Sequence, residues 1–155
     1  MRNPTVLLVE DNADDEALTI RALEQHGVVG QVVRDGAEAL DVLLDGDHGR
    51  PLPELVLLDL KLPKVDGLEV LRRIRADERT AQLPVVVLTA STEESDVMES
   101  YAGGATSYVS KPVDFQQFSE AVRKLASLAD GTFSAATVRL LAALCATEPP
   151  PRSTS

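Results

Sequence analysis

Short apolar runs alternate with longer amphipathic stretches along most of the chain. The apolar runs are rich in Val and Leu and are bounded by polar residues, Gly or Pro, which is typical of strands buried on both faces of a sheet. We expect strands at 5–9, 28–34, 55–58, 84–88 and 105–110. The pattern therefore predicts five strands, each followed by a segment of a different period.

The intervening stretches carry apolar residues at helical spacing, and we expect helices at 14–26, 37–45, from 67 onward, 93–102 and from 115 onward. In the first of them, Leu18, Ala22 and Leu23 share a face, the first turn is acidic, and Gly27 stands at the C′ position. The stripe of the last helix is Phe115, Phe118, Val122 and Leu125, with Asp114 as its cap.

Strands that alternate with helices predict an α/β fold, in which helices cover both faces of a parallel sheet. Right-handed crossovers leave few topologies for such a chain. We expect the flavodoxin-like, doubly wound (βα)5 order with a central five-stranded parallel sheet. Ligands of such folds bind at the carboxyl ends of the strands, near the point where the strand order reverses.

The C-terminal segment departs from this alternation. We expect one domain over 1–128 and an extension over 129–155, with one short helix at 134–147. The composition of EPPPRSTS, residues 148–155, is that of a disordered tail. Leu140 and Leu144 give the helix a second apolar row, which favours a dimerisation arm over simple packing against the domain.

Charge and cysteine content narrow the classes of function. The chain has 25 Asp and Glu against 15 Lys and Arg, a net charge of −10, which disfavours direct binding of nucleic acid or of an anionic membrane. No apolar run approaches the roughly 18 residues of a membrane span, and the N-terminal run is too short for a signal peptide. A single cysteine, Cys145, excludes an internal disulfide, so we expect a cytoplasmic protein.

Carboxylates, a hydroxyl and an ammonium group stand at the ends of the predicted strands or directly after them. The first strand ends in Glu10 and Asp11, the third in Asp59 and the fourth in Thr89, and the fifth is followed by Lys111. Because the carboxyl ends of parallel strands lie on one edge of the sheet, these side chains should converge on one pocket.

Three carboxylates in one pocket would repel each other and raise each other's pKa values, and a divalent cation relieves that repulsion. Oxygen ligands without His or Cys favour a hard metal, and Mg²⁺ is the usual one. Asp59 can then attack phosphorus to form an acyl phosphate, while Thr89 and Lys111 hold the phosphoryl oxygens.

Each of these residues also has a structural explanation. Asp14 and Asp15 lie where a helix N-terminus favours negative charge, and we assign them to that role. Thr89 alone could cap the next helix, and the Lys111–Pro112 pair alone would indicate only a turn. Four such positions on one predicted edge make coincidence the weaker explanation.

Four motifs resemble, in order and spacing, those of bacterial two-component response-regulator receiver domains. They are VLLVEDN, LLDLKLPKVDGLEVL, PVVVLTAS and GATSYVSKP, and the resemblance spans about residues 5–128. Within that family, LVEDNADDEALT, the long loop at 45–54 and LDLKLPKVDG resemble single-domain regulators associated with bacterial phytochromes.

The resemblance implies a role for each matching position at the acidic pocket. Asp59 would be the phospho-accepting aspartate. Asp11 would bind Mg²⁺ directly, and Glu10 directly or through water. Lys61 would offer its backbone carbonyl to the metal.

The resemblance also implies a switch at the other strand ends. Thr89 would follow the phosphoryl group, and Lys111 would pair with it, before a peptide bond to Pro112 that is often cis in the family. Tyr108 would be the aromatic switch residue. Lys61 and Ser91 occupy positions that influence the hydrolysis of the acyl phosphate.

Several functions remain open for this chemistry. The first is a signalling relay that takes a phosphoryl group from a sensor histidine kinase, of phytochrome type by the resemblance, and acts as a homodimer through the fourth helix, fifth strand and fifth helix or the C-terminal arm. The second is a phosphate sink for a shared kinase. A metal-dependent phosphatase would need an acid where Lys61 stands, so we expect no enzymatic activity beyond the protein's own phosphorylation and dephosphorylation. A nucleotide-binding module would need a glycine-rich phosphate loop, which the sequence lacks.

Overall fold

The computed structural model describes residues 5–44, 52–60, 62, 65–89, 102–110 and 115–127. Its strands are β1 (Thr5–Val9), β2 (Val29–Val33), β3 (Leu55–Asp59), β4 (Val85–Thr89) and β5 (Ser107–Ser110). Its helices are α1 (Ala13–Gln25), α2 (Gly36–Leu43), α3 (Gly67–Ala76) and α5 (Phe115–Ser127). The predicted alternation of strands and helices is therefore confirmed within these ranges.

The five strands form one parallel sheet in the order β2-β1-β3-β4-β5. This is the flavodoxin-like order that the sequence predicted. The chain moves outward from β1 to β2 and then crosses back to β3 on the other side of β1. The strand order thus reverses between β1 and β3, and the carboxyl ends of these two strands are where a ligand is expected.

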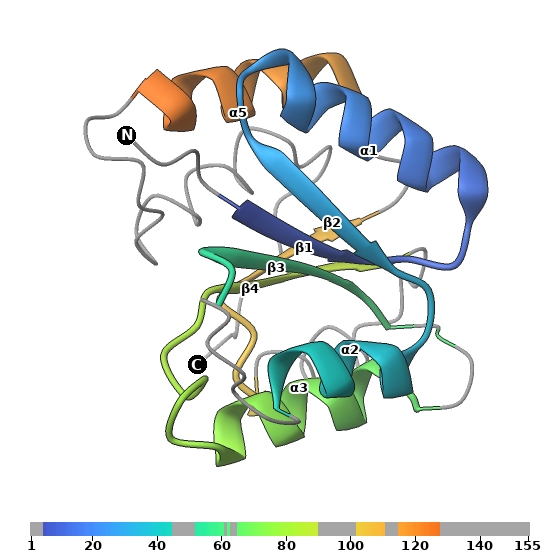
Figure 1. Ribbon diagram of the computed structural model, residues 1–155, viewed down its shortest axis with the longest axis vertical. Coiled ribbons are helices and arrows are strands. Elements are labelled where there is room, and N and C mark those ends of the chain that lie inside the picture. The colour runs from blue at the N-terminus through green and yellow to red at the C-terminus, as the bar shows by residue number, and fades with distance from the viewer. Residues whose placement is uncertain are drawn as a thin grey trace, which may run out of the picture.

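Helices cover both faces of the sheet, with α1 and α5 above it and α2 and α3 below it (Figure 1). Each central strand sends alternate side chains to the two sides, as the pleat requires. The core on the α1–α5 side includes Val6, Leu8, Leu55, Leu57, Val86, Leu88, Phe118 and Val122. The core on the α2–α3 side includes Leu7, Val9, Val56, Leu58, Val85, Val87, Val70, Leu71 and Ile74. These strands are apolar without alternation because both of their faces are buried.

The buried face of α1 differs from the predicted one. Leu18 is 44% exposed, and Thr19 takes its place beside Ala22 and Leu23 in the core. A buried hydroxyl needs a partner, and the Thr19 side chain has one because its Oγ1 donates to the Asp15 carbonyl at 2.8 Å. The predicted end of the helix is confirmed, since Gly27 follows it with a φ of +77°.

The outer strand β2 is shorter than the sequence predicted, and Val29, its first residue, is 49% exposed. As an edge strand it is covered less than β1 and β3. Other predicted features lie outside the described residues: the cap at Asp114, the helix at 93–102 except for Ala102, the helix at 134–147 and the tail at 148–155.

Candidate functional site

Three carboxylates meet at the carboxyl edge of the sheet, where the strand order reverses. Glu10 and Asp11 directly follow β1, and Asp59 is the last residue of β3. Each of the three offers one oxygen atom, and these oxygens all lie within 4.8 Å of one another. Glu10 and Asp59 are 1% and 6% exposed, whereas Asp11 is exposed. The structure thus brings together the three acids that the sequence predicted to converge.

Glu10 is held at this edge by the neighbouring strand and by the turn that it begins. Its backbone N–H donates to the carbonyl of Val33, the last residue of β2, at 3.0 Å. Its side-chain Oε2 accepts from the backbone N–H of Asn12 at 3.3 Å. The carboxylate is therefore fixed by the chain itself and turned back across the β1–α1 turn.

Asn12 begins α1 as its N-cap and completes the same turn. Its Oδ1 accepts from the Asp15 backbone N–H at 3.0 Å, which satisfies one of the free N–H groups of the first helical turn. Asp14, Asp15 and Glu16 supply the acidic first turn, so the predicted helix-terminus role of Asp14 and Asp15 is confirmed. One short segment therefore serves both as a helix cap and as the backbone of the acidic site.

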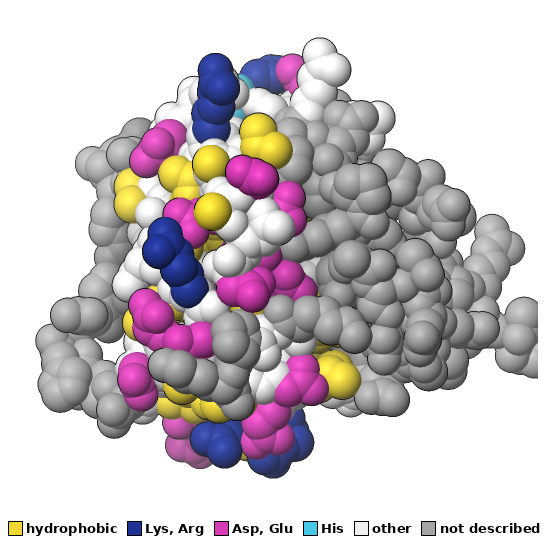
Figure 2. All heavy atoms as spheres, turned by 90° about the vertical axis from the view of Figure 1, so that its right-hand side faces the viewer, with side chains coloured by type: hydrophobic (Ala, Val, Ile, Leu, Met, Phe, Trp, Pro, Cys, Tyr) yellow, Lys and Arg dark blue, Asp and Glu magenta, His cyan; other side chains and the backbone are white. Residues whose placement is uncertain are grey.

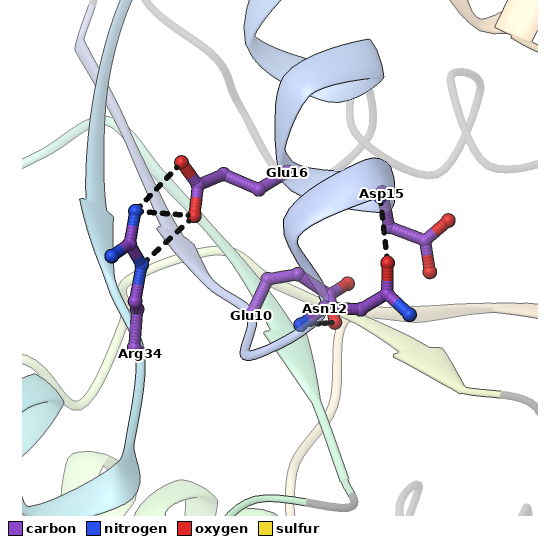
Figure 3. A network of polar contacts seen from close by, with 5 residues as sticks. All are labelled: Glu10, Asn12, Asp15, Glu16 and Arg34. Atoms are coloured by element: carbon purple, nitrogen blue, oxygen red, sulfur yellow. Dashed lines mark hydrogen bonds and ion pairs between the residues drawn. The ribbon is translucent and has the colours of Figure 1, made fainter.

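An ion pair connects the far side of this turn to β2. The Arg34 guanidinium donates from Nε to Glu16 Oε1 and from Nη2 to Glu16 Oε2, both at 3.0 Å (Figure 3). Arg34 directly follows Val33, whose carbonyl already holds Glu10. Arg34 is exposed, and an ion pair with an exposed partner contributes little to stability. It tethers the first turn of α1 to the end of β2.

The backbone after Asp59 is held by a close approach at Gly67, the first residue of α3. The Gly67 N–H donates to the Leu60 carbonyl at 3.1 Å. A Cβ atom at this position would lie 2.5 Å from both the Asp59 carbonyl oxygen and the Leu60 Cα. Only a glycine lets the start of α3 lie this close to the end of β3, so Gly67 fixes the backbone that carries Asp59.

The other predicted site residues are described in part or not at all. Thr89 ends β4, and its backbone pairs with Ser110 of β5, while Tyr108 pairs with Val87. Asp59 pairs with Leu88, the residue before Thr89. The Thr89 backbone thus lies at the same edge as Asp59. The side chains of Thr89 and Tyr108 lie outside the description, as do Lys61, Lys111 and Pro112 altogether.

The described surface around the site is acidic. Figure 2 faces the carboxyl edge of the sheet, and Asp and Glu side chains gather across the middle of this face. The first turn of α1 adds three carboxylates to those of the site. Such a surface raises the local concentration of cations.

The donor set fits a hard divalent cation. All three side chains offer carboxylate oxygens, and no His or Cys of the described residues belongs to the cluster. Mg²⁺ and Mn²⁺ prefer this chemistry, and Mg²⁺ commonly uses one or two carboxylates and keeps several waters. Two of the three carboxylates are buried, where neighbouring charges of the same sign are costly, and this adds to the case for a cation.

The sequence analysis missed the residues that orient the acids. It assigned no role to Asn12, Glu16, Arg34 or Gly67. The signal for Asn12 was present, because an Asn three residues before an acid at the start of an apolar period is an N-cap pattern. No local signal links Arg34 to Glu16, since their pairing depends on the contact between β2 and α1.

Comparison with known proteins identifies the family. The profile of the response regulator receiver domain matches residues 6–123. The chain belongs to this family. The "Probable methanogenesis regulatory protein FilR2" of Methanothrix harundinacea (strain 6Ac) is 46% identical over 77% of this chain and 79% of its own length.

Solved structures with the same fold include regulators of phytochrome systems. The phosphorylated cyanobacterial phytochrome response regulator RcpA superposes with a TM-score of 0.72 at 36% sequence identity. The match covers 83% of this chain and 98% of the RcpA chain. The bacteriophytochrome response regulator AtBRR gives 0.66 at 47% identity, covering 84% and 97%. The Mn²⁺-bound form of the response regulator Rcp1 gives 0.69 at 36% identity, covering 81% and 93%. The receiver assignment and the likeness to phytochrome-associated regulators are thus confirmed.

The helices in the described part of the chain were also compared with the requirements of a membrane span. None of them combines the length and the hydropathy needed to cross a bilayer.

Proposed function

We propose that this receiver domain is switched by phosphorylation of Asp59, with a phosphoryl group supplied by a sensor histidine kinase. The convergence of Glu10, Asp11 and Asp59 within 4.8 Å at the carboxyl edge is the observation that carries this proposal. Asp59 is fixed by β3 and by the close approach of Gly67, and Glu10 is fixed by β2 and Asn12. The site is therefore preorganised to receive a reacting group.

The transfer consists of one displacement at phosphorus. A carboxylate oxygen of Asp59 forms the new P–O bond while the P–N bond to the kinase histidine breaks. The imidazole nitrogen keeps the electron pair of the broken bond and leaves. A Mg²⁺ ion held by Glu10, Asp11, Asp59 and the Lys61 carbonyl would neutralise charge on the phosphoryl oxygens. The chain thus promotes only its own phosphorylation and the later attack of water on the acyl phosphate.

Thr89 and Lys111 are the proposed phosphoryl-binding residues. The Thr89 backbone lies at the carboxyl edge beside Asp59, and Lys111 directly follows β5, whose last residue pairs with Thr89. Charge-assisted hydrogen bonds are worth about 1.5–3 kcal/mol each. Two of them approach the roughly 5.5 kcal/mol that inverts a 1:99 equilibrium. Movement of Thr89 would give Tyr108 room to turn inward and change the surface around β5 and α5, with the peptide at Pro112 as a further element of the switch.

A kinase of phytochrome type is the partner that the comparisons favour. RcpA and AtBRR, which resemble this chain over more than four fifths of its length, are regulators of phytochrome systems. We propose that the chain acts as a homodimer through the region of the fourth helix, β5 and α5 or through the extension at 129–155. The receiver itself would comprise residues 1–128.

Intact-protein mass spectrometry with acetyl phosphate tests the central step. Wild type should gain one phosphoryl group in the presence of Mg²⁺ and none after chelation. Asp59→Asn should gain none under either condition. Asp66→Asn is the matched control, because Asp66 is an exposed carboxylate in the same β3–α3 loop.

Two outcomes would contradict the proposal. One is uptake by Asp59→Asn equal to that of wild type, and the other is loss of uptake in Asp66→Asn alone. A wild type that neither gains mass nor binds beryllofluoride would show that this receiver does not carry out phosphorylation.

A further inference from the structure

Arg75, near the end of α3, differs from the other arginines of that helix. Arg72 and Arg73 are exposed and pair with the carboxylate of Glu69. Arg75 is half-buried, and its bonds go to uncharged groups of the chain. Its Nε donates to the Gly104 carbonyl at 2.9 Å, and its Nη1 donates to the Leu83 carbonyl at 2.6 Å.

The guanidinium joins segments that are distant in the sequence. Longer contacts of 3.4 Å connect Nη1 to the Thr80 carbonyl and Nη2 to the Thr106 hydroxyl. Arg75 therefore bridges the end of α3, the turn between α3 and β4, and the residues that lead into β5. A planar guanidinium with several fixed donors suits this task, which the single ammonium of lysine cannot reproduce.

Thr106 carries the bridge into the sheet. Its backbone N–H donates to the Val85 carbonyl at 2.8 Å, and its Oγ1 accepts from the Val85 N–H at 3.0 Å. These two bonds attach the start of β5 to the first residue of β4. Tyr108 lies two residues further on, paired with Val87.

Two features of Gly104 suit its contact with Arg75. Its φ of +106° lies in a region that L side chains rarely adopt. A Cβ atom there would lie 2.7 Å from Arg75 Cγ and 2.9 Å from Arg75 Nε. The missing side chain thus leaves the space through which the Arg75 stem reaches the Gly104 carbonyl.

We propose that Arg75 is a positioning residue for the switch: it fixes the start of β5 at the amino edge of the sheet, so that β5 transmits the phosphorylation of Asp59. This inference rests on the proposed function. Val85 begins β4 and Thr89 ends it, so Arg75 acts at the end of the strand opposite the acidic site. Its described hydrogen bonds go to residues at the amino edge, and its action passes through Thr106 and β5.

The test compares Arg75→Met with Arg72→Met in the full chain. Arg72 lies on the same helix and loses the same charge, but its only described partner is Glu69. Two readouts are needed: acetyl phosphate uptake at Asp59, and the change in amide hydrogen exchange that beryllofluoride with Mg²⁺ causes in 104–110 and 115–127. Loss of a hydrogen bond to a charged group corresponds to about a tenfold change in a local opening equilibrium.

We expect Arg75→Met to take up the phosphoryl group like wild type, to exchange about tenfold faster in 104–110 without ligand, and to lose most of the beryllofluoride-induced protection there. Arg72→Met should match wild type in both readouts. If Arg75→Met folds poorly, Arg75→Lys keeps the charge without the fork and should show the same separation between the readouts.

Two results would overturn the inference. A full beryllofluoride response in Arg75→Met would mean that β5 does not depend on this residue. Equal loss of uptake and response would mean a general structural role. Failure of the proposed function is distinguishable, because wild type itself would then show neither uptake nor a beryllofluoride response.

Discussion

The two edges of the sheet carry groups of opposite charge: clustered carboxylates at the carboxyl edge and a half-buried arginine at the amino edge. At the carboxyl edge, Glu10, Asp11 and Asp59 bring like charges within 4.8 Å of one another. At the amino edge, the positively charged guanidinium of Arg75 donates hydrogen bonds to the carbonyls of Gly104 and Leu83. By our proposal a bound cation neutralises part of the charge in the first arrangement, whereas in the second the charged group is a side chain of the protein.

The proposed metal and phosphoryl site would change its charge when a ligand binds, whereas the charge of Arg75 is present with or without a ligand. Repulsion among clustered carboxylates costs stability until a cation neutralises part of their charge. Charge-assisted bonds to carbonyls stabilise the folded state in every condition in which the arginine is charged. Burial lowers the pKa of Arg75, yet an arginine stays protonated throughout the range in which proteins are stable. Removing one charge should therefore have opposite effects at the two edges.

The largest expected effect is at the carboxyl edge. Without divalent cations, Asp59→Asn should raise the free energy of unfolding by roughly 1–2 kcal/mol, because it removes one of three repelling charges. Mg²⁺ at about 100 times its dissociation constant should stabilise wild type by about 2.7 kcal/mol and the variant by much less. Urea unfolding with and without Mg²⁺ measures both changes, and the order of stability should invert.

The control for this inversion is Asp41→Asn, which removes an exposed carboxylate from α2. Its stability should stay within about 0.5 kcal/mol of wild type in both buffers. An Asp59→Asn variant that is less stable than wild type without metal would contradict the view that repulsion dominates at this edge.

At the amino edge the sign should reverse. Arg75→Met should lower the free energy of unfolding by about 1.5–3 kcal/mol, since it removes hydrogen bonds to a charged group and leaves part-buried carbonyls without that donor. Arg72→Met on the same helix should lower it much less, because Arg72 is exposed and Arg73 also binds Glu69. Urea unfolding of both variants provides the comparison, and equal losses would remove the distinction between the two arginines.

The carboxyl edge could be predicted from the sequence because its chemistry is local to strand ends. Each of the acids directly follows or ends an apolar run, so the strand pattern alone brought Glu10, Asp11 and Asp59 to one edge. The alternation of elements and the rules of handedness left few topologies, and the flavodoxin-like order expected among them is the one observed. The predicted buried face of α1 was wrong at Leu18. Thr19 takes that place in the core, because its hydroxyl is bonded to a carbonyl of its own helix.

The amino edge could not be predicted in the same way. Arg75 lies within a run of three arginines in RRIR, and nothing in that run separates the one that is half-buried from those that pair with Glu69. Its partner Gly104 lies 29 positions further along the chain, where only the three-dimensional fold brings the two together. Long-range bonds between a side chain and a backbone carbonyl leave no periodic trace in the sequence.

The smallest expected effect uses pH to separate the two kinds of arginine on α3. Hydrogen bonds from Arg72 and Arg73 lower the pKa of Glu69 from 4.5 to about 2. Because the folded pKa is below the unfolded one, the contribution of Glu69 is complete above pH 4.5 and is lost as the pH falls towards 2. Wild type should therefore be slightly more stable than Glu69→Gln near neutral pH, and the difference should shrink over that acidic range and in about 1 M salt.

The carbonyl partners of Arg75 do not titrate, so the loss of stability in Arg75→Met should persist over the same range. Thermal unfolding of the three proteins at several pH values measures this, and parallel curves for wild type and Glu69→Gln would mean that this exposed pair adds nothing to stability.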